Sequence, residues 1–283
     1  MSTDRLAIGL TRVVVNGLRH RGARCRLKGD IKAAARAYQA ALAIGERSLP
    51  TDALLTAQVR NDLAVLLKYT GRFVEAGELY ESALKVFAAR FGREHPEVAT
   101  ILHNLGGLAH AAGRPADGEG PAREALRVRR QVLGPNHPAT AADGAALAGI
   151  LIAMDRDDEA AQLLEHAFEV FVHSGPMHLE VGITVGSLGA IDARRGDLDR
   201  AEARVRQALR IKEQQMGAHH LELVPTLGTL GVISRRQGNL AEARRLYQRG
   251  IALLDGRVAP DHPQLASLQS NLRRLDAEQA RGI

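Results

Sequence analysis

The chain has 283 residues, of which 45% are hydrophobic and 3% are aromatic, and it contains one cysteine, Cys25. One thiol excludes a disulfide framework within the chain and a zinc site built on cysteines. The charged fraction of 25% is that of a folded protein and excludes disorder of the whole chain. Because aromatic residues are scarce, the core must consist of Leu, Ala, Val and Ile, which favours closely packed helices.

The positive charge is concentrated at the start of the chain. The formal net charge is +6, from 38 basic and 32 acidic residues. Residues 1–49 contain ten basic and three acidic residues, so the remaining 234 residues are nearly neutral, with 28 basic and 29 acidic residues. An uneven charge of this kind says more about a partner than about the fold.

The start of the chain does not have the pattern of a signal peptide or a membrane span. The apolar run between Leu6 and Leu18 is interrupted by Thr11, Arg12 and Asn16 and is too short and too polar for either role. We therefore expect a soluble, cytoplasmic protein that does not bind membranes.

Short turn sequences recur through the chain at intervals of 41 or 42 residues, and a column of histidines repeats in step with them. The turns are Lys28-Gly29-Asp30, Thr70-Gly71-Arg72, Ala112-Gly113-Arg114, Met154-Asp155-Arg156, Arg195-Gly196-Asp197 and Gln237-Gly238-Asn239. The histidines are His95, His137, His178, His220 and His262. Two columns that keep one period over most of the chain indicate an internal repeat.

Small residues recur at fixed offsets from these turns. Seven residues before each turn the residue is Gly or Ala: Gly22, Ala64, Gly106, Ala148, Gly189 and Gly231. Five and twelve residues after the turn, Ala or Gly stands in all six units, and the residue nine after it is mostly large, as at Tyr38, Tyr80 and Tyr247. Offsets of three, four and seven share one helical face, so the pattern predicts two helices that approach closely, with the large residues filling the space between them.

This pattern resembles the tetratricopeptide repeat, and in particular the 42-residue variety found in kinesin light chains. The nearest matches are Asn61-Asp62-Leu63-Ala64, Gly71, Glu75-Ala76, Tyr80, Ala83-Leu84 and Pro260-Asp261-His262-Pro263. The resemblance implies an all-α, right-handed α-solenoid of six helix-turn-helix units plus a C-terminal capping helix. We expect one domain, with units at about 11–50, 51–93, 94–135, 136–176, 177–218 and 219–260, and a capping helix at about 263–280.

The regular histidines suggest a metal site, but neighbouring units of such a solenoid are about 10 Å apart. Two histidines from adjacent units therefore cannot bind one ion at about 2 Å. We expect them to cap helix starts, and we expect no metal and no cofactor. Asp192 stands where other units have Cys25, Leu67, Ala109, Leu151 and Ser234. It is predicted to pair with a nearby arginine such as Arg195, with a catalytic carboxylate of shifted pKa as the alternative.

In this family the first helix of each unit lines the concave surface, and the resemblance implies that ligands lie there as extended peptides or helices. The implied groove is polar and basic in its first half, small and apolar in the middle and basic again at the far end. Mid-helix Gly107, Gly149, Gly186 and Gly228 indicate either room for a ligand or close helix packing. The candidate peptide-binding residues are Arg19, Arg26, Gln58, Asn61, Lys68, His103, Asn104, His110, Arg194, Arg235 and Arg236.

The favoured function is therefore a scaffold or adaptor that is not an enzyme and binds an acidic, partly apolar peptide segment of a partner protein. Asn61 and Asn104 match asparagines that bind a peptide main chain in related arrays, and basic neighbours favour carboxylates on the ligand. These residues could instead be no more than a solvated face. The end helices could also support a homo-oligomer.

Two other functions remain open. The first is nucleic-acid binding through Arg5, Arg12, Arg19 and Arg26, which recur every seven residues, although no aromatic residues stand among them for base stacking. The second is an enzyme or small-molecule binder that uses Asp192, His103 or His110, although the sequence contains no G-x-S-x-G, P-loop, dinucleotide or H-E-x-x-H motif.

Overall fold

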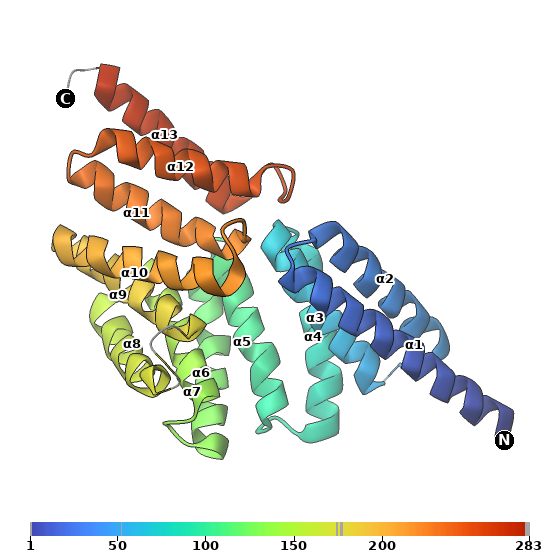
Figure 1. The fold of residues 1–283 in the computed structure, drawn as a ribbon. Coiled ribbons are helices and arrows are strands. Elements are labelled where there is room, and N and C mark those ends of the chain that lie inside the picture. The colour runs from blue at the N-terminus through green and yellow to red at the C-terminus, as the bar shows by residue number, and fades with distance from the viewer. Residues whose placement is uncertain (1, 52, 174, 176–177, 281–283) are drawn as a thin grey trace.

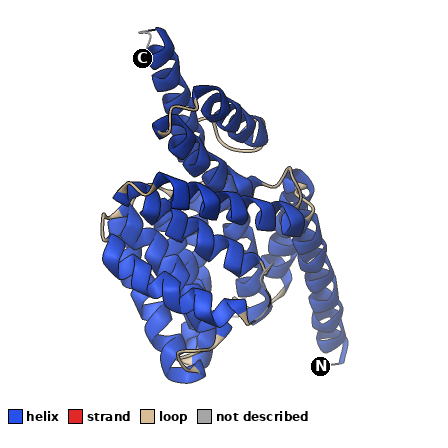
Figure 2. Cartoon of the chain, turned by 60° about the vertical axis from the view of Figure 1, so that its left-hand side comes forward, coloured by secondary structure: helices blue, strands red, loops and turns tan. Residues whose placement is uncertain are grey.

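The computed structural model describes residues 2–51, 53–173, 175 and 178–280, and within them the chain forms thirteen α-helices and one 3-10 turn (Figures 1 and 2). The helices are α1 (Ser2–Leu27), α2 (Ile31–Ser48), α3 (Leu54–Thr70), α4 (Phe73–Phe91), α5 (Pro96–Ala111), α6 (Pro115–Leu133), α7 (Pro138–Ala153), α8 (Asp157–Val172), α9 (Leu179–Arg195), α10 (Leu198–Met216), α11 (Val224–Arg236), α12 (Leu240–Leu254) and α13 (Pro263–Ala280). The 3-10 turn η1 (Leu221–Leu223) precedes α11.

Helices pack in consecutive pairs, α1 with α2 through α11 with α12, and each pair contacts the next. This confirms the predicted all-α solenoid of six helix-turn-helix units with α13 as the capping helix. Helix α1 begins at Ser2, several residues before the first unit was expected to start, because no proline interrupts the chain before Leu27. No helix in the described part of the chain is long and apolar enough to cross a membrane.

The predicted turns are left-handed, which explains why glycine recurs in them. Gly71, Gly113 and Gly196 have φ angles of 85°, 73° and 92°, values that residues with a Cβ adopt at a cost. Unit 4 has Asp155 at the equivalent position with φ 60°, and it is the one non-glycine residue with positive φ in the described ranges. The turn sequences therefore recur once in every unit because the chain must reverse direction there, between the two helices that pack as a pair.

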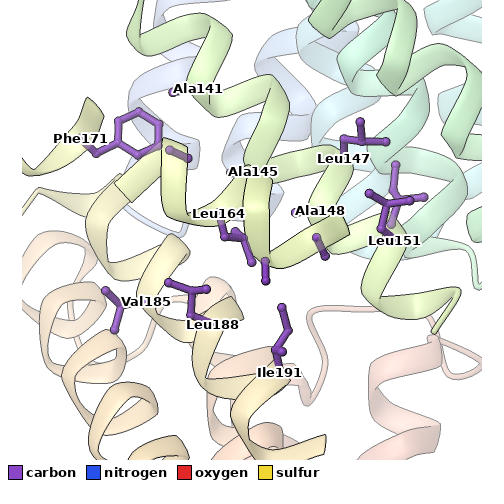
Figure 3. Packing of buried hydrophobic residues seen from close by; sticks show 14 of the residues in the cluster. Ala141, Ala145, Leu147, Ala148, Leu151, Leu164, Phe171, Val185, Leu188 and Ile191 are labelled. Atoms are coloured by element: carbon purple, nitrogen blue, oxygen red, sulfur yellow. The ribbon is translucent and has the colours of Figure 1, made fainter. Parts of the chain in front are cut away.

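The small-residue columns are confirmed as sites of close helix packing. A methyl group added at Gly22 would lie 2.7 Å from the ring of Tyr38, and one at Gly189 would lie 2.7 Å from the side chain of Val205. The core continues between units, where small alanines of α7 pack beside larger side chains of α8 and α9 (Figure 3). The residues labelled there are Ala141, Ala145, Leu147, Ala148, Leu151, Leu164, Phe171, Val185, Leu188 and Ile191.

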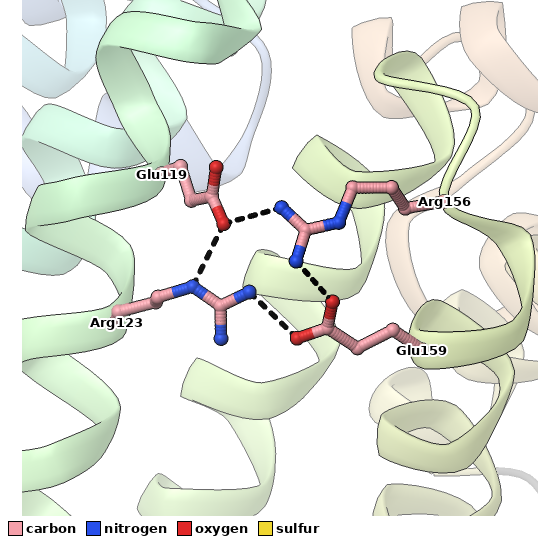
Figure 4. Close-up of polar contacts among 4 residues, drawn as sticks. All are labelled: Glu119, Arg123, Arg156 and Glu159. Carbon is pink, nitrogen blue, oxygen red and sulfur yellow. Dashed lines mark hydrogen bonds and ion pairs between the residues drawn. The ribbon is translucent and has the colours of Figure 1, made fainter.

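Ion pairs join successive units on the second helices. Arg123 of α6 donates to Glu119 at 2.8 Å and to Glu159 of α8 at 2.6 Å, and Arg156 binds the same two carboxylates (Figure 4). The hydrogen bond from Arg123 holds the pKa of Glu119 below its usual value. A closed ring of four charges thus links units 3 and 4, and its exposed ion pairs individually contribute about 0–1 kcal/mol.

The two ends of the solenoid meet, which the repeat pattern did not predict. The segment between α12 and α13 contacts the turns of units 1 and 2: Ala259 N–H donates to the Thr70 carbonyl at 2.9 Å, and the rings of Phe73 and His262 are 6.0 Å apart. In addition, Arg257 donates to the Gly29 carbonyl at 3.4 Å. The superhelix therefore closes on itself, and its inner surface is bounded by the C-terminal unit as well as by the first helices.

Candidate functional site

The inner surface contains a recess of 310 Å³. It is formed mainly by α7, α9 and α11, with one residue of α5 and two of α10 at its edges. The walls are apolar over much of their area and carry a few hydroxyl groups and three basic side chains. The lining residues are His110, Gly149, Ile152, Ala153, Ile183, Gly186, Ser187, Ala190, Arg194, Val205, Lys212, Pro225, Thr226 and Thr229. Of the candidate groove residues, His110 and Arg194 lie in this wall.

Several candidates from the first half of the groove form one hydrogen-bonded chain. Arg19 donates to Asp62 at 2.7 Å and to Gln58 at 3.4 Å. Asn104 donates to the Asn61 side chain at 2.8 Å, and Asn61 donates to Asp62 at 3.4 Å. The two asparagines contact each other, so part of their hydrogen-bonding capacity, and the charge of Arg19, is already used within the protein.

His103 belongs to a separate cluster around a buried carboxylate. Its Nδ1 lies 2.7 Å from Asp143, which is 2% exposed, and Arg129 lies 2.7 Å from the other oxygen of the same carboxylate. Sequence reasoning missed both Asp143 and Arg129. The Arg129 guanidinium balances the charge of this buried carboxylate, and removing it would leave an uncompensated charge, so the cluster has a structural role.

Arg26 and Lys68 lie near Glu222, a residue of the 3-10 turn η1 that precedes α11. The Lys68 ammonium is 5.1 Å from the centre of the Tyr69 ring. The pKa of Lys68 is lowered because burial disfavours its charged form, and the nearby Glu222 carboxylate opposes this shift in part. Glu222 also raises the pKa of Tyr69 well above its usual value. No carboxylate lies within ion-pair distance of either cation among the residues described.

The basic residues at the far end are bound within the protein. Arg194 donates to Asp157 at 2.8 Å and also contacts Asp155. Arg235 pairs with Glu278 of the capping helix at 2.7 Å, and Arg236 donates to the Ala193 carbonyl. These internal partners reduce the positive charge that a ligand would meet at this end of the inner surface.

Asp192 pairs with an arginine, as predicted, but that arginine is not Arg195. The expected role of the histidine column is confirmed. Asp192 is 7% exposed and pairs with Arg204 of α10 at 2.6 Å, because the side chain faces the second helix of its own unit. Arg195 points to the preceding unit and pairs with Asp158. Each histidine of the column caps a helix start, its Nδ1 accepting the backbone N–H two residues later: His95, His137, His178, His220 and His262.

The residues proposed for the two alternative functions do not gather at one place. Asp192, His103 and His110 have separate surroundings, and neither Asp192 nor His103 lines the recess. In the arginine stripe, Arg12 is exposed and Arg19 is paired with Asp62, while the side chain of Arg5 lies outside the described residues. The stripe is therefore not a uniform row of free cations.

The mid-helix glycines of the groove differ from those of the packing column. A methyl group at Gly107 would lie 3.5 Å from the Lys68 ammonium, one at Gly149 would lie 3.5 Å from the His110 ring, and one at Gly228 would lie 3.5 Å from Leu268. These are ordinary contacts, so helix packing does not require glycine there. Gly186 is tighter, at 3.1 Å from Ala208. Close helix packing therefore explains the glycine at position 186 but not the other three glycines.

Lys212 is the charged residue of the recess that sequence reasoning missed. It stands sixteen residues after its turn, in a column that otherwise reads Gly45, Phe87, Arg129, Phe171 and Leu254. It is 8% exposed, and its ammonium donates to the Thr226 hydroxyl at 2.9 Å. The sequence did contain a signal for this residue, because Arg129 and Lys212 are basic in a column that is otherwise glycine or apolar.

Comparison with known proteins places the repeat pattern in a family. The tetratricopeptide repeat model matches residues 14–88, 55–119 and 179–256, which together make up more than half of the chain. Kinesin light chain-related protein 1 from Arabidopsis thaliana is 26% identical over an alignment of 145 residues. The alignment covers 48% of this chain and 24% of the relative, so the chain spans about a quarter of that protein.

Solved structures share the fold at low sequence identity. BtubC (BKLC) from P. vanneervenii has a TM-score of 0.53 at 21% identity, with 83% of this chain and 90% of that chain covered. A Rap protein complexed with Competence and Sporulation Factor has a TM-score of 0.64 at 13% identity, covering 93% and 75%. The periodic turns, the small-residue columns and these matches agree, and the chain belongs to the tetratricopeptide repeat family.

Proposed function

We propose that this protein is an interaction scaffold that binds a peptide segment of a partner protein on the inner surface of its solenoid. The repeats and their structural neighbours support the general role of a protein-interaction scaffold. The neighbouring Rap structure was solved as a complex with Competence and Sporulation Factor, which supports partner binding by a solenoid of this fold. The cytoplasm is the proposed location.

The recess formed mainly by α7, α9 and α11 is the observation that supports the more specific part of this proposal, an acidic and partly apolar peptide. Its apolar walls include Ile152 and Ile183, while His110 and Lys212 stand at the edges. Ligand sites are concave and mostly apolar with a few placed polar groups. The segment bound here would therefore insert a small apolar side chain and carry negative charge nearby, where Lys68 and Arg26 have no ion-pair partner among the described residues.

The test is a selection of linear peptides from a random phage library. Ala153 is an exposed alanine on the wall of the recess, so Ala153→Trp should obstruct the site without disturbing the core. Ala116 is an exposed alanine of α6 that does not line the recess, and Ala116→Trp is the matched control.

We expect the wild type and Ala116→Trp to bind the enriched peptides equally and Ala153→Trp to bind them at least tenfold more weakly. The enriched sequences should contain Asp or Glu beside a small apolar residue, and their affinity should fall as salt is added. Equal binding by Ala153→Trp would refute the site, and peptides without acidic residues would refute the acidic character of the partner.

A further inference from the structure

The repeat allows Lys212 to be compared with a residue in the same structural position two units earlier. Arg129 and Lys212 both stand sixteen residues after their turns, and each meets the residue fourteen positions later, on the first helix of the next unit. For Arg129 that residue is Asp143, at 2.7 Å, and for Lys212 it is Thr226, at 2.9 Å. One buried cation thus has a carboxylate, and the other has a hydroxyl in its place.

The surroundings of Lys212 do not supply the missing carboxylate. Besides Thr226, its ammonium is 3.5 Å from the backbone carbonyl of Glu222. The carboxylates of Glu222 and Glu180 act on it from a greater distance, and no ion pair to Lys212 exists within the described part of the chain. Lys212 is 8% exposed, and a buried cation without a carboxylate or other anionic partner is costly.

Lys212 and Thr226 both line the recess, and the Lys212 ammonium is bonded to the Thr226 hydroxyl there. We propose that the recess is a binding site for a carboxylate that carries a short apolar group, with Lys212 holding the carboxylate in the place that Asp143 occupies for Arg129. The hydroxyls of Thr226, Thr229 and Ser187 supply further hydrogen bonds around it, and Ile152 and Ile183 contact the apolar group.

The size and lining of the recess decide the ligand class. At 310 Å³ it is at the lower end of ligand pockets, so it holds a terminal group and not a folded segment. A phosphate carries up to about two negative charges, whereas Lys212 is the one buried cation among the described residues that line the recess, and a carboxylate matches its single charge. Both a free carboxylic acid and the C-terminal residue of a peptide have the required chemistry. If the carboxylate belongs to a peptide, the inference rests on the proposed function and adds that the C-terminal end of the peptide is bound.

The decisive variant is Thr226→Asp, because it gives Lys212 the carboxylate that Arg129 already has and so removes the need for a ligand anion. Lys212→Met removes the cation at similar length. Ala116→Asp, on an exposed site of α6 outside the recess, adds the same charge as Thr226→Asp and is the control.

Binding is measured by calorimetry and by thermal shift at constant ionic strength, with 4-methylpentanoate and its uncharged analogue 4-methylpentanamide. We expect the wild type and Ala116→Asp to prefer the acid about ten- to hundredfold, the range of a hydrogen bond to a charged group. Lys212→Met and Thr226→Asp should lose that preference, and Thr226→Asp should unfold at the same temperature as the wild type or higher. Equal binding of acid and amide by the wild type, no binding of the acid, or undiminished binding by Thr226→Asp would overturn the proposal.

A second arm uses the peptide Gly-Ser-Ala-Leu-Leu with a free or an amidated C-terminus. Tighter binding of the free-acid peptide than of 4-methylpentanoate identifies a peptide C-terminus as the source of the carboxylate. If 4-methylpentanoate binds and neither peptide does, the carboxylate site stands while peptide binding at this recess fails, so the two proposals are distinguished.

Discussion

Two adjacent glycines of α5 provide a test of the packing argument within a single helix. Gly106 belongs to the small-residue column, and Gly107 faces the inner surface. A methyl group at Gly106 would lie 3.0 Å from Cβ of Ala122 and 3.1 Å from the backbone carbonyl of Gly118, whereas one at Gly107 would meet nothing nearer than the Lys68 ammonium at 3.5 Å. We therefore expect Gly106→Ala and Gly107→Ala to change stability in opposite directions.

The magnitude follows from two effects. Replacing Gly by Ala in a helix interior stabilises it by about 1 kcal/mol, and this gain is the same at both positions. At Gly106 the obstructing atoms belong to the backbone and Cβ of α6, which can move only with their helix, so overpacking costs about 1–3 kcal/mol. At Gly107 that cost is absent. The two variants should differ by about 1–3 kcal/mol in free energy of unfolding, with Gly107→Ala the more stable.

Urea denaturation followed by circular dichroism measures this difference, and hydrogen exchange of α5 and α6 localises it, because a repeat array need not unfold in one step. Both variants should keep the helical content of the wild type. Equal stability of the two variants, or a less stable Gly107→Ala, would refute the view that helix approach requires glycine in one column and leaves it optional in the other.

Three further predictions concern the turns, the core and the segment between α12 and α13. Gly113→Ala should destabilise by about 1–2 kcal/mol in urea unfolding, since φ is 73° although no atom obstructs a methyl group there, and helical Gly17→Ala should stabilise. Tyr80→Phe should leave the unfolding midpoint unchanged or raise it, because the buried hydroxyl has no hydrogen-bond partner in the described chain; a clear loss would contradict this. Burial lowers the pKa of His262, so the folded protein keeps the ring neutral while the unfolded chain protonates it near pH 6.5. Stability is therefore full above that pH and falls below it. The melting temperature should drop between pH 7.5 and 5.5, and His262→Asn, which retains a capping side chain, should drop less.

Much of the fold could be predicted from sequence because its determinants are local and repeat. Left-handed turns at Gly71 and Gly196 need glycine, the approach of paired helices needs small residues such as Gly189, and His220 caps a helix two residues away. Each of these requirements is met within one unit, so six copies of the same pattern reinforce one another. The inner-surface positions around the recess follow from the same periodicity.

The partners of the charged side chains could not be predicted in this way. Asp192 binds Arg204 and not Arg195, because the choice depends on which way the side chain leaves its helix. Arg19 and Arg235 stand in the predicted groove, but carboxylates from neighbouring helices bind them. Such pairs join residues about 43 positions apart, and a long side chain has several acids within reach.

The sequence by itself therefore determined the repeat, its helices and its packing columns, since these depend on contacts within a unit or between adjacent units. The tertiary structure alone decided that Ala259 and His262 meet Thr70 and Phe73, and that Lys212 lines a recess without a carboxylate. The physical reason is that small rotations from unit to unit add up along the solenoid. Their sum, which no single unit encodes, sets where its two ends and its inner charges lie.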